Sequence, residues 1–240
     1  MIDAHCHIDA YADPYETALL VERSHVLTIA VTNLPSAFKA AYPHVQRLRS
    51  LRLAVGLHPL LAEVHARERA QFATCLKRTS FVGEVGLDFS AEGIATRDVQ
   101  IESFQYVLGL VKQQPKFVTI HSRRAEAMVL DLVEAAGVRP VVFHWFSGSL
   151  KQVDRLLAQS HFCSVNPAML RSRNGKSIIE RLPPDRVLTE TDGPFVMVER
   201  RPALPMDVTL VEHYLAQLWQ RPVEEVRQQV RQNLRDAIPV

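Results

Sequence analysis

The sequence predicts a single α/β domain over residues 1–240, built as a (β/α)8 barrel of the TIM type. Eight short apolar stretches, rich in β-branched and aromatic residues, alternate with longer stretches of helical periodicity. The length is close to the ~250 residues typical of this barrel. A doubly wound open sheet is the structural alternative, but the chain has only 9 glycines and lacks the glycine-rich phosphate turn that such a sheet would carry.

The expected strands are short and apolar, as in a parallel sheet that is buried on both faces. They are expected at residues 1–4, 26–31, 51–56, 81–83, 117–120, 141–143, 162–165 and 187–189. Helices are expected at residues 14–23, 36–49, 63–78, 96–113, 124–136, 150–159, 176–181, 207–219 and 222–235. No linker indicates a second domain.

Composition excludes several classes of protein. With 28 Lys and Arg against 26 Asp and Glu, the net charge of +2 excludes a polybasic protein that holds nucleic acid by bulk charge. The hydrophobic share of 47% excludes disorder. Three cysteines are too few for a disulfide framework, so a cytoplasmic location is expected. Asp3 interrupts any signal-peptide pattern and no apolar run reaches 18 residues, so no membrane contact is expected.

Histidines and carboxylates follow the predicted strands, at the ends that share one rim of a closed barrel. About one histidine would fall within three positions after a strand by chance, if the barrel is correct. Five do so: His5, His7, His58, His121 and His144. Glu84 and Asp192 follow the fourth and eighth strands. Active sites of this fold lie on that rim, so these residues are expected to meet in one pocket.

Imidazole and carboxylate groups are good ligands for Zn, Mn or Co, and no thiolate is needed. Alternate residues of a strand point the same way, so His5 and His7 can reach one ion while Cys6 faces away. A larger ligand set is formed by His5, His7, Glu84, His121, His144 and Asp192. Six ligands exceed the needs of one tetrahedral ion and indicate two divalent ions about 3.5–4 Å apart. Such a pair activates water for the hydrolysis of a phosphate ester or an amide.

Basic and aromatic residues of the same rim are candidates for substrate contacts. Arg171 and Arg173, in an expected loop over residues 171–176, could join Arg123 in contacting phosphates, although a solvated loop is an equally good interpretation. His58 is expected to contact the substrate. Residues 145 and 146, a tryptophan and a phenylalanine, could stack a base but are expected to be buried.

Six motifs, taken in order, resemble the TatD family of metal-dependent deoxyribonucleases, which are amidohydrolase-like barrels. They are D-A-H-C-H-I-D at residues 3–9, G-L-H-P at 56–59, G-E-V-G-L-D at 83–88, H-S-R at 121–123, H-W-F-S-G at 144–148 and E-T-D-G-P at 190–194. The resemblance implies two ions (Zn, Mn, Mg or Co) on the six ligands named above, with Glu84 as the bridge. It implies that Asp192 helps to deprotonate the nucleophilic water, that Glu190 supports the metal shell and that His58 touches the scissile phosphate.

The family resemblance further implies cleavage of DNA, often by a 3′-5′ exonuclease that acts on single strands or 3′ ends. Residues 144–149, 164–170 and 188–195 are similar to the QatD branch, the TatD-like subunit of the four-component Qat anti-phage system. That likeness implies phage defence beside an ATPase and a QueC-like protein. The chain departs from the family at Phe89, where tyrosine is usual, and at residues 196–205, which lack a segment that shapes the substrate groove.

Two other classes of function remain open from the sequence. One is a barrel hydrolase that acts on a small amide, a lactone or a modified nucleobase, and the other is a subunit that mainly forms a complex. Many barrel amidohydrolases carry a bridging lysine on the fourth strand, and Glu84 stands at that place here, which favours the nuclease.

Overall fold

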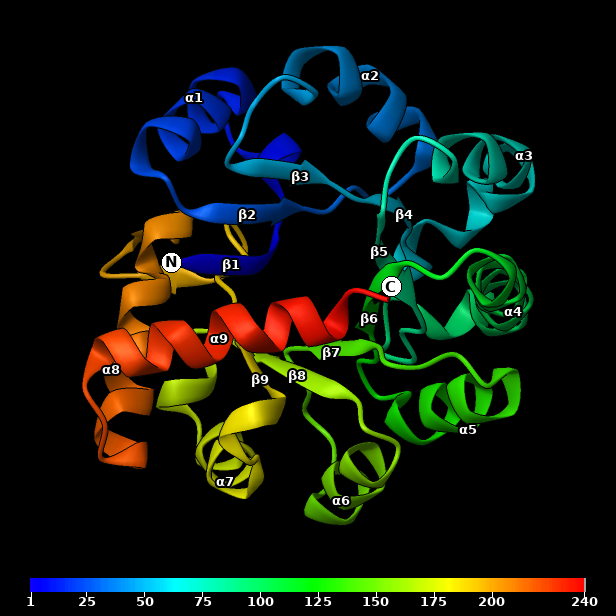
Figure 1. Cartoon of the computed structure of the whole chain (residues 1–240). Coiled ribbons are helices and arrows are strands. Elements are labelled where there is room, and N and C mark those ends of the chain that lie inside the picture. Colours follow the sequence, from blue (N-terminus) through cyan, green and yellow to red (C-terminus); the bar gives the residue numbers. More distant parts are fainter. Residues whose placement is uncertain (240) are drawn as a thin grey trace.

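The computed structural model describes residues 1–239 and has a ring of parallel strands inside a ring of helices (Figure 1). The strands of the ring are β1 (Ile2–Cys6), β2 (Leu27–Ala30), β3 (Leu51–Leu53), β4 (Val55–Leu57), β5 (Phe81–Gly86), β6 (Phe117–His121), β7 (Val142–His144), β8 (Phe162–Val165) and β9 (Val187–Thr189). Each pairs in parallel with its neighbours in the two sheets that form the wall. The predicted fold class is confirmed.

The third expected strand is in fact two strands, so the prediction of one strand over residues 51–56 was wrong. β3 completes a three-stranded sheet with β1 and β2, while β4 begins a six-stranded sheet that runs to β9. At Gly56 an added Cβ atom would lie 1.6 Å from the Thr32 carbonyl oxygen, so only glycine fits there. That same oxygen accepts a hydrogen bond from the Glu84 amide at 3.0 Å. Just after the break, the chain is thus in close contact with a distant segment, which no local pattern reveals.

Hydrogen bonds between the first and last strands close the ring. The Thr189 hydroxyl donates to the carbonyl of Ile2. Beyond the end of β9, the amide of Asp192 donates to the carbonyl of His5 at 3.0 Å, and the amide of His7 donates to the carbonyl of Gly193 at 2.8 Å. The segments that carry His5, His7 and Asp192 are thus fixed side by side.

All nine expected helices are present. They are α1 (Pro14–Ser24), α2 (Pro35–Val45), α3 (His65–Leu76), α4 (Arg97–Gln113), α5 (Glu126–Ala136), α6 (Leu150–Ala158), α7 (Arg173–Arg181), α8 (Val208–Trp219) and α9 (Val223–Ala237). α7 begins three residues earlier than expected, because the Ser172 hydroxyl caps it by accepting from the amide of Gly175. The expected loop at residues 171–176 is therefore mostly the first turns of a helix.

Residues 196–205 contain a hairpin that the sequence analysis did not predict. Its strands are β10 (Met197–Val198) and β11 (Arg201–Pro202), which pair antiparallel. Glu199 and Arg200, at the turn, have φ values of 48° and 70°, as a two-residue hairpin turn with two left-handed residues requires.

One end of the barrel is covered by α9, which crosses the ring of strands in Figure 1. Val226, Val230 and Leu234 of this helix are buried in the core. Asn233 donates hydrogen bonds to the carbonyls of Pro184 at 2.8 Å and Val187 at 2.6 Å, so α9 lies at the N-terminal end of β9. The opposite end, where the strands finish, is left for polar side chains. Within residues 1–239, no helix combines the length and apolarity needed to cross a bilayer.

Candidate metal centre

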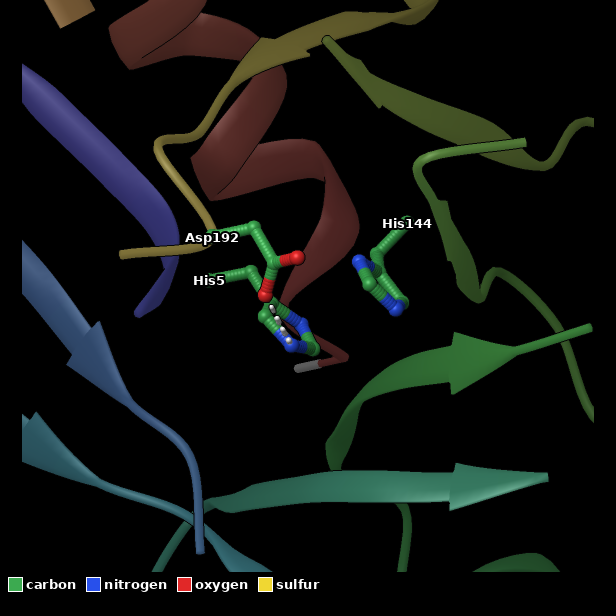
Figure 2. A group of neighbouring side chains, drawn as sticks. All are labelled: His5, His144 and Asp192. Atoms are coloured by element: carbon green, nitrogen blue, oxygen red, sulfur yellow. Dashed lines mark ion pairs between the residues drawn. The ribbon is translucent and has the colours of Figure 1, made fainter. Parts of the chain in front are cut away.

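The six residues expected to hold metal gather at the C-terminal ends of the strands. His5 comes from β1, Glu84 from β5, His121 from β6 and His144 from β7. Of the remaining two, His7 follows directly after β1, and Asp192 lies three residues after the end of β9. Figure 2 shows His5, His144 and Asp192 pointing toward one another from three separate segments of the chain. Most of these side chains are buried, with His5 completely inaccessible and His121 half-buried.

Glu84 lies at the centre of the group, and its Oε2 atom faces three histidines. The Nε2 atoms of His7, His58 and His5 lie 3.1, 3.3 and 3.5 Å from this oxygen. The Nε2 atoms of His5 and His7 are 3.3 Å from each other. Glu84 Oε2 and these three imidazole nitrogens therefore form one compact group of possible metal ligands.

The second carboxylate oxygen, Oε1, faces a different pair of histidines. The Nδ1 atom of His121 lies 2.6 Å from it and the Nε2 atom of His144 lies 2.7 Å from it. The two oxygens of Glu84 are therefore directed at separate groups of imidazoles, on either side of the carboxylate.

Asp192 completes the first group. Its Oδ1 atom lies 3.7 Å from His7 Nε2 and 3.8 Å from His5 Nε2. The ring of His144 stacks on that of His5, with 3.8 Å between the centroids. Asp192 adopts a left-handed backbone conformation with φ of 50°, which aspartate tolerates better than most residues.

The donor set fits divalent cations. Ligands about 2.1 Å from a metal lie roughly 3.0–3.4 Å from each other in tetrahedral or octahedral geometry. The triangle formed by His5 Nε2, His7 Nε2 and Glu84 Oε2 has sides of 3.3, 3.1 and 3.5 Å, close to that range. Two further triplets have ligand atoms within 4.8 Å of one another: His5, His144 and Asp192, and His58, Glu84 and His121. These residues are able to hold metal ions.

Three of the histidines have a partner at the ring nitrogen that faces away from Glu84. His5 Nδ1 lies 2.9 Å from the Thr119 hydroxyl, and His121 Nε2 lies 2.9 Å from an oxygen of Asp88. His144 Nδ1 lies 3.6 Å from Glu190 Oε1. Such partners fix the orientation of metal-ligating imidazoles and raise their basicity. Neither Thr119 nor Asp88 was expected from the sequence to have this role, although Asp88 lies within the G-E-V-G-L-D motif.

Glu190, expected to support the metal shell, lies one layer outside the central carboxylate. It accepts hydrogen bonds from the Trp145 amide and the Asn166 side chain, both at 3.0 Å, and from the hydroxyl of Ser164. Burial raises its pKa, but His144, His5 and the hydroxyl of Ser164 outweigh burial, and the pKa is lowered. Glu190 is therefore an ionised group that fixes the segment after β7.

Asp3 is a further buried carboxyl group that the sequence analysis did not single out. It accepts from the amide and the hydroxyl of Thr191, and from the amide of His5 at 3.3 Å. It therefore connects the two segments that carry His5 and Asp192. Its place two residues before His5 gave a signal, because alternate residues of a strand point to the same side.

Electrostatics differ strongly between the two carboxyl groups of the centre. Burial raises the pKa of Glu84, but the surrounding imidazoles of His58, His144 and His121 bring the pKa well below its ordinary value. Burial raises the pKa of Asp192 to about 7, against the opposite pull of His144 and His7. Glu84 is therefore a permanent anion, whereas Asp192 exchanges its proton near neutral pH.

The residues expected to contact substrate occupy two different places. His58 is nearly buried inside the histidine group, 3.3 Å from Glu84. Arg123 is exposed at the rim and pairs with Glu92 at 3.2 Å. Arg171 donates to the carbonyl of Met197 at 2.9 Å and so attaches the segment before α7 to the hairpin. Arg173, the first residue of α7, is exposed.

Two exposed aromatic side chains follow residues of the centre. Trp145 comes directly after His144 and is 39% exposed, so the expectation that it is buried was wrong. The same expectation was right for Phe146, which is 1% exposed. Trp145 has φ of 38°, a left-handed conformation that is a genuine outlier for a bulky residue and is common at functional sites. Phe195 is 58% exposed, and its ring centroid lies 5.0 Å from that of His7.

Known proteins resemble the chain over almost its full length. The uncharacterized metal-dependent hydrolase YjjV of Escherichia coli K12 is 28% identical over 251 residues, covering 97% of this chain and 95% of that protein. The crystal structure of YjjV has a TM-score of 0.89 at 26% identity, covering 100% of this chain and 98% of the other. Human deoxyribonuclease TATDN3 is 24% identical over 259 residues, covering 100% of this chain and 94% of that protein.

A more distant structure shows the fold alone. Dihydroorotase from Campylobacter jejuni has a TM-score of 0.61 at 10% identity, covering 98% of this chain and 80% of the other. The sequence model of the family described as TatD related DNase matches residues 2–238. The chain therefore belongs to the family of TatD-related DNases.

Proposed function

We propose that the chain hydrolyses phosphodiester bonds in DNA at a centre of two divalent ions. One ion is assigned to His5, His7 and Asp192, the other to His121 and His144, with Glu84 bridging them. The observation that carries the proposal is the division of the Glu84 oxygens, since Oε2 faces His5 and His7 while Oε1 faces His121 and His144. The name of the human relative, a deoxyribonuclease, supports DNA as the substrate.

Bound ions would supply an acidified water and positive charge for the scissile phosphate. The chain's own groups supply the remaining functions. Asp192 Oδ1, on a carboxyl group with a pKa of about 7, is suited to take the proton of the attacking water at neutral pH. Burial lowers the pKa of His58, so its imidazole is neutral and can donate one hydrogen bond to a phosphate oxygen. Glu190 lies 3.6 Å from His144 Nδ1 and holds the backbone next to His144 by accepting from the amide of Trp145.

The rim suits a single strand with unpaired bases. Trp145 and Phe195 offer exposed aromatic faces next to the centre, and stacking of a base on such a side chain is worth roughly 1–3 kcal/mol. Arg123, Arg171 and Arg173 are cations of the same rim that can contact phosphates without reading bases. We propose that the chain is a 3′-5′ exonuclease that binds the 3′ end of a DNA strand between these aromatic and cationic groups.

We further propose that the chain acts as a single catalytic domain, residues 1–240, within an anti-phage system of the Qat type, beside an ATPase and a QueC-like protein. The basis is the resemblance of residues 144–149, 164–170 and 188–195 to the QatD branch. All three cysteines are unpaired and buried, which suits the reducing cytoplasm in which such a system would work. Co-purification from cells that express the four proteins together tests this part: recovery of the chain without the ATPase or the QueC-like protein would contradict it.

The nuclease proposal is tested on single-stranded oligonucleotides labelled at either end. Protein stripped with EDTA is supplied in turn with Mn, Mg, Zn or Co, and the products and the bound metal are measured. We expect metal-dependent release of mononucleotides from the 3′ end, and two ions per chain. Equal rates with and without EDTA, or one ion at saturation, would contradict the proposal. Hydrolysis of an amide or lactone without DNA cleavage would favour the small-molecule hydrolase.

A further inference from the structure

A cavity of about 520 Å³, open to the surface, lies at the end of the barrel opposite the metal centre. Its walls are β3, the start of β5 at Phe81, the end of α2 at Tyr42 and the segments that follow α2 and α3. This is the place where the barrel wall is divided, because β3 pairs with β2 whereas β5 pairs with β4. The Thr79 hydroxyl crosses the gap and donates to the carbonyl of Leu53 at 2.6 Å.

The cavity is strongly cationic although the chain as a whole is almost neutral. Four arginines line it, namely Arg47, Arg49, Arg52 and Arg78, and no aspartate or glutamate is among the lining residues. Within residues 1–239, none of the four forms an ion pair with a carboxylate, in contrast to Arg155 and Arg201 elsewhere on the surface.

One cation and one anion lie next to the cavity. The Lys116 ammonium group donates to the carbonyl of the lining residue Thr79 at 2.7 Å and so adds a positive charge beside the wall. The carboxylate of Glu22 accepts from the backbone amides of Arg49 and Ser50, at 2.7–3.1 Å. Glu22 is therefore engaged by amides rather than by the guanidinium groups. The local field of the cavity favours an anion.

Two of the guanidinium groups are held in position by the chain itself. Arg52 donates through Nη1 to the carbonyls of Arg49 at 2.9 Å and Leu51 at 3.0 Å. The guanidinium of Arg78 lies 4.0 Å above the ring of Tyr42, a cation–π contact. Each contact restrains the side chain and leaves further N–H groups of the planar fork for a ligand, which lowers the entropy lost on binding.

We propose that this cavity binds a phosphate-bearing ligand of nucleotide size. Guanidinium forks match the geometry of phosphate oxygens and bind them in a bidentate manner. The volume is within the usual range for small-molecule sites, about 300–1,000 Å³. Tyr42, Leu48 and Phe81 add apolar surface for the rest of the ligand, and Thr79 and Ser80 add hydroxyl groups. The proposal is independent of the proposed nuclease activity, because the site is separate from the metal centre.

Binding is measured by calorimetry on the full chain in EDTA, so that neither turnover nor metal-held phosphate contributes. The probes are inorganic pyrophosphate, a deoxynucleoside 5′-monophosphate and a single-stranded decanucleotide. The test variant is Arg52→Ala/Arg78→Ala. The matched control is Arg67→Ala/Arg235→Ala, which removes two exposed arginines at other places and changes the net charge equally. Thermal unfolding verifies that both variants remain folded.

We expect the native chain to bind the mononucleotide and pyrophosphate, with affinity at least tenfold lower in the test variant and within twofold in the control. An Arg52→Lys/Arg78→Lys variant should retain part of the affinity, because charge remains while the fork is lost. An equal loss in test and control variants would overturn the proposal in favour of diffuse charge. No binding to the native chain, or binding of the decanucleotide alone, would also overturn it.

Discussion

The two ends of the barrel use buried groups in opposite ways. At the C-terminal end of the strands, Glu84 is surrounded by five histidines, and Trp145 and Asp192 adopt left-handed conformations. At the N-terminal end, α9 covers the ring with apolar side chains such as Val230 and Leu234. The difference indicates that one end is organised for chemistry at a cost in stability, while the other end contributes the stability.

Histidines show the same contrast between the ends. His144, at the end of β7, lies beside two carboxylates, and although burial lowers its pKa, Glu84 and Glu190 raise it well above the ordinary value. His161, just before β8, accepts a hydrogen bond from the amide of Val141 at 3.3 Å. Burial and the nearby charge of Arg139 lower its pKa to about 4. The carboxylates beside His144 raise its pKa, whereas His161, which has no carboxylate within hydrogen-bond distance among the described residues, stays neutral.

The largest effect is expected from Glu84→Gln, which removes the central negative charge and keeps the shape. We expect kcat/KM on DNA to fall at least ~10³-fold, equivalent to about 4 kcal/mol, because the imidazoles lose the anion that organises them. Bound metal should fall as well, while the melting temperature of the metal-free protein, measured in EDTA, is retained. The control is Glu92→Gln, an exposed carboxylate of the rim that pairs with Arg123. Similar activity in the two variants would show that Glu84 has no role in the metal centre.

Leu234→Ala should produce the opposite result at the other end. The Leu234 side chain, on the buried face of α9, is 4% exposed. Its truncation leaves a cavity and should lower the free energy of unfolding by about 2–5 kcal/mol. Activity per folded molecule should be unchanged. Urea denaturation measures the loss, with Leu218→Ala, a partly exposed leucine of α8, as control. If Leu234→Ala lowered kcat under conditions in which the protein is fully folded, the division of activity and stability between the two ends of the barrel would be wrong.

Asp88→Asn tests whether His121 is oriented from outside the centre. Asn keeps the size of the side chain but loses the charge that lies 2.9 Å from His121 Nε2. Loss of such a partner typically lowers metal affinity or activity about 10–100-fold. The decisive readout is the metal dissociation constant, measured by competition with a chelator. An unchanged constant would show that Asp88 only supports the fold.

Because His161 is buried and neutral, we expect the free energy of unfolding to depend on pH in acid. Its pKa is near 6.5 in the unfolded chain and about 4 in the folded chain, so between these values the unfolded chain binds more protons. The free energy of unfolding must therefore decrease as the pH falls through this window, and the contribution of His161 between pH 7 and 5 is about 2 kcal/mol. Comparison of native and His161→Asn protein at both pH values measures it. The variant should lose about 2 kcal/mol less; parallel losses would refute the assignment.

Phe195→Ala should have the smallest effect. Removal of one exposed stacking face costs roughly 1–3 kcal/mol per base, so we expect KM for single-stranded DNA to rise about tenfold with little change in kcat. An oligonucleotide with an abasic 3′ residue should be cut equally by both proteins. If Phe195→Ala instead lowers activity on the normal and the abasic oligonucleotide by the same factor, Phe195 has a structural role beside His7 and does not contact a base.

The sequence predicted the barrel and the meeting of its rim residues because both follow from regular patterns. Apolar strands at regular intervals specify the ring, and residues just past those strands share one end of it. His5, Glu84 and Asp192 could be named in this way although His5 and Asp192 are more than a hundred residues apart in the sequence. Their roles as metal ligands remain predictions.

Other features could not be predicted because they depend on contacts between distant segments. The requirement for glycine at residue 56, just past the break between β3 and β4, results from the approach of the Thr32 carbonyl. The exposure of Trp145 results from its backbone conformation, which is fixed by the bond from its amide to Glu190. Thr119 and Asp88 acquire their roles only from the orientation of two histidine rings. In each case the neighbouring residues in the sequence give no sign of the partner.

The pairing of the first and last strands connects ion binding to the integrity of the whole chain. A cation held by both His5 and Asp192 would link the first strand to the segment after the last strand of the ring, so any opening of the ring would have to release it. At 100 times its dissociation constant, such an ion adds about 2.7 kcal/mol to the folded state by mass action. Melting curves recorded at rising metal concentration would therefore measure occupancy of this metal site without any substrate.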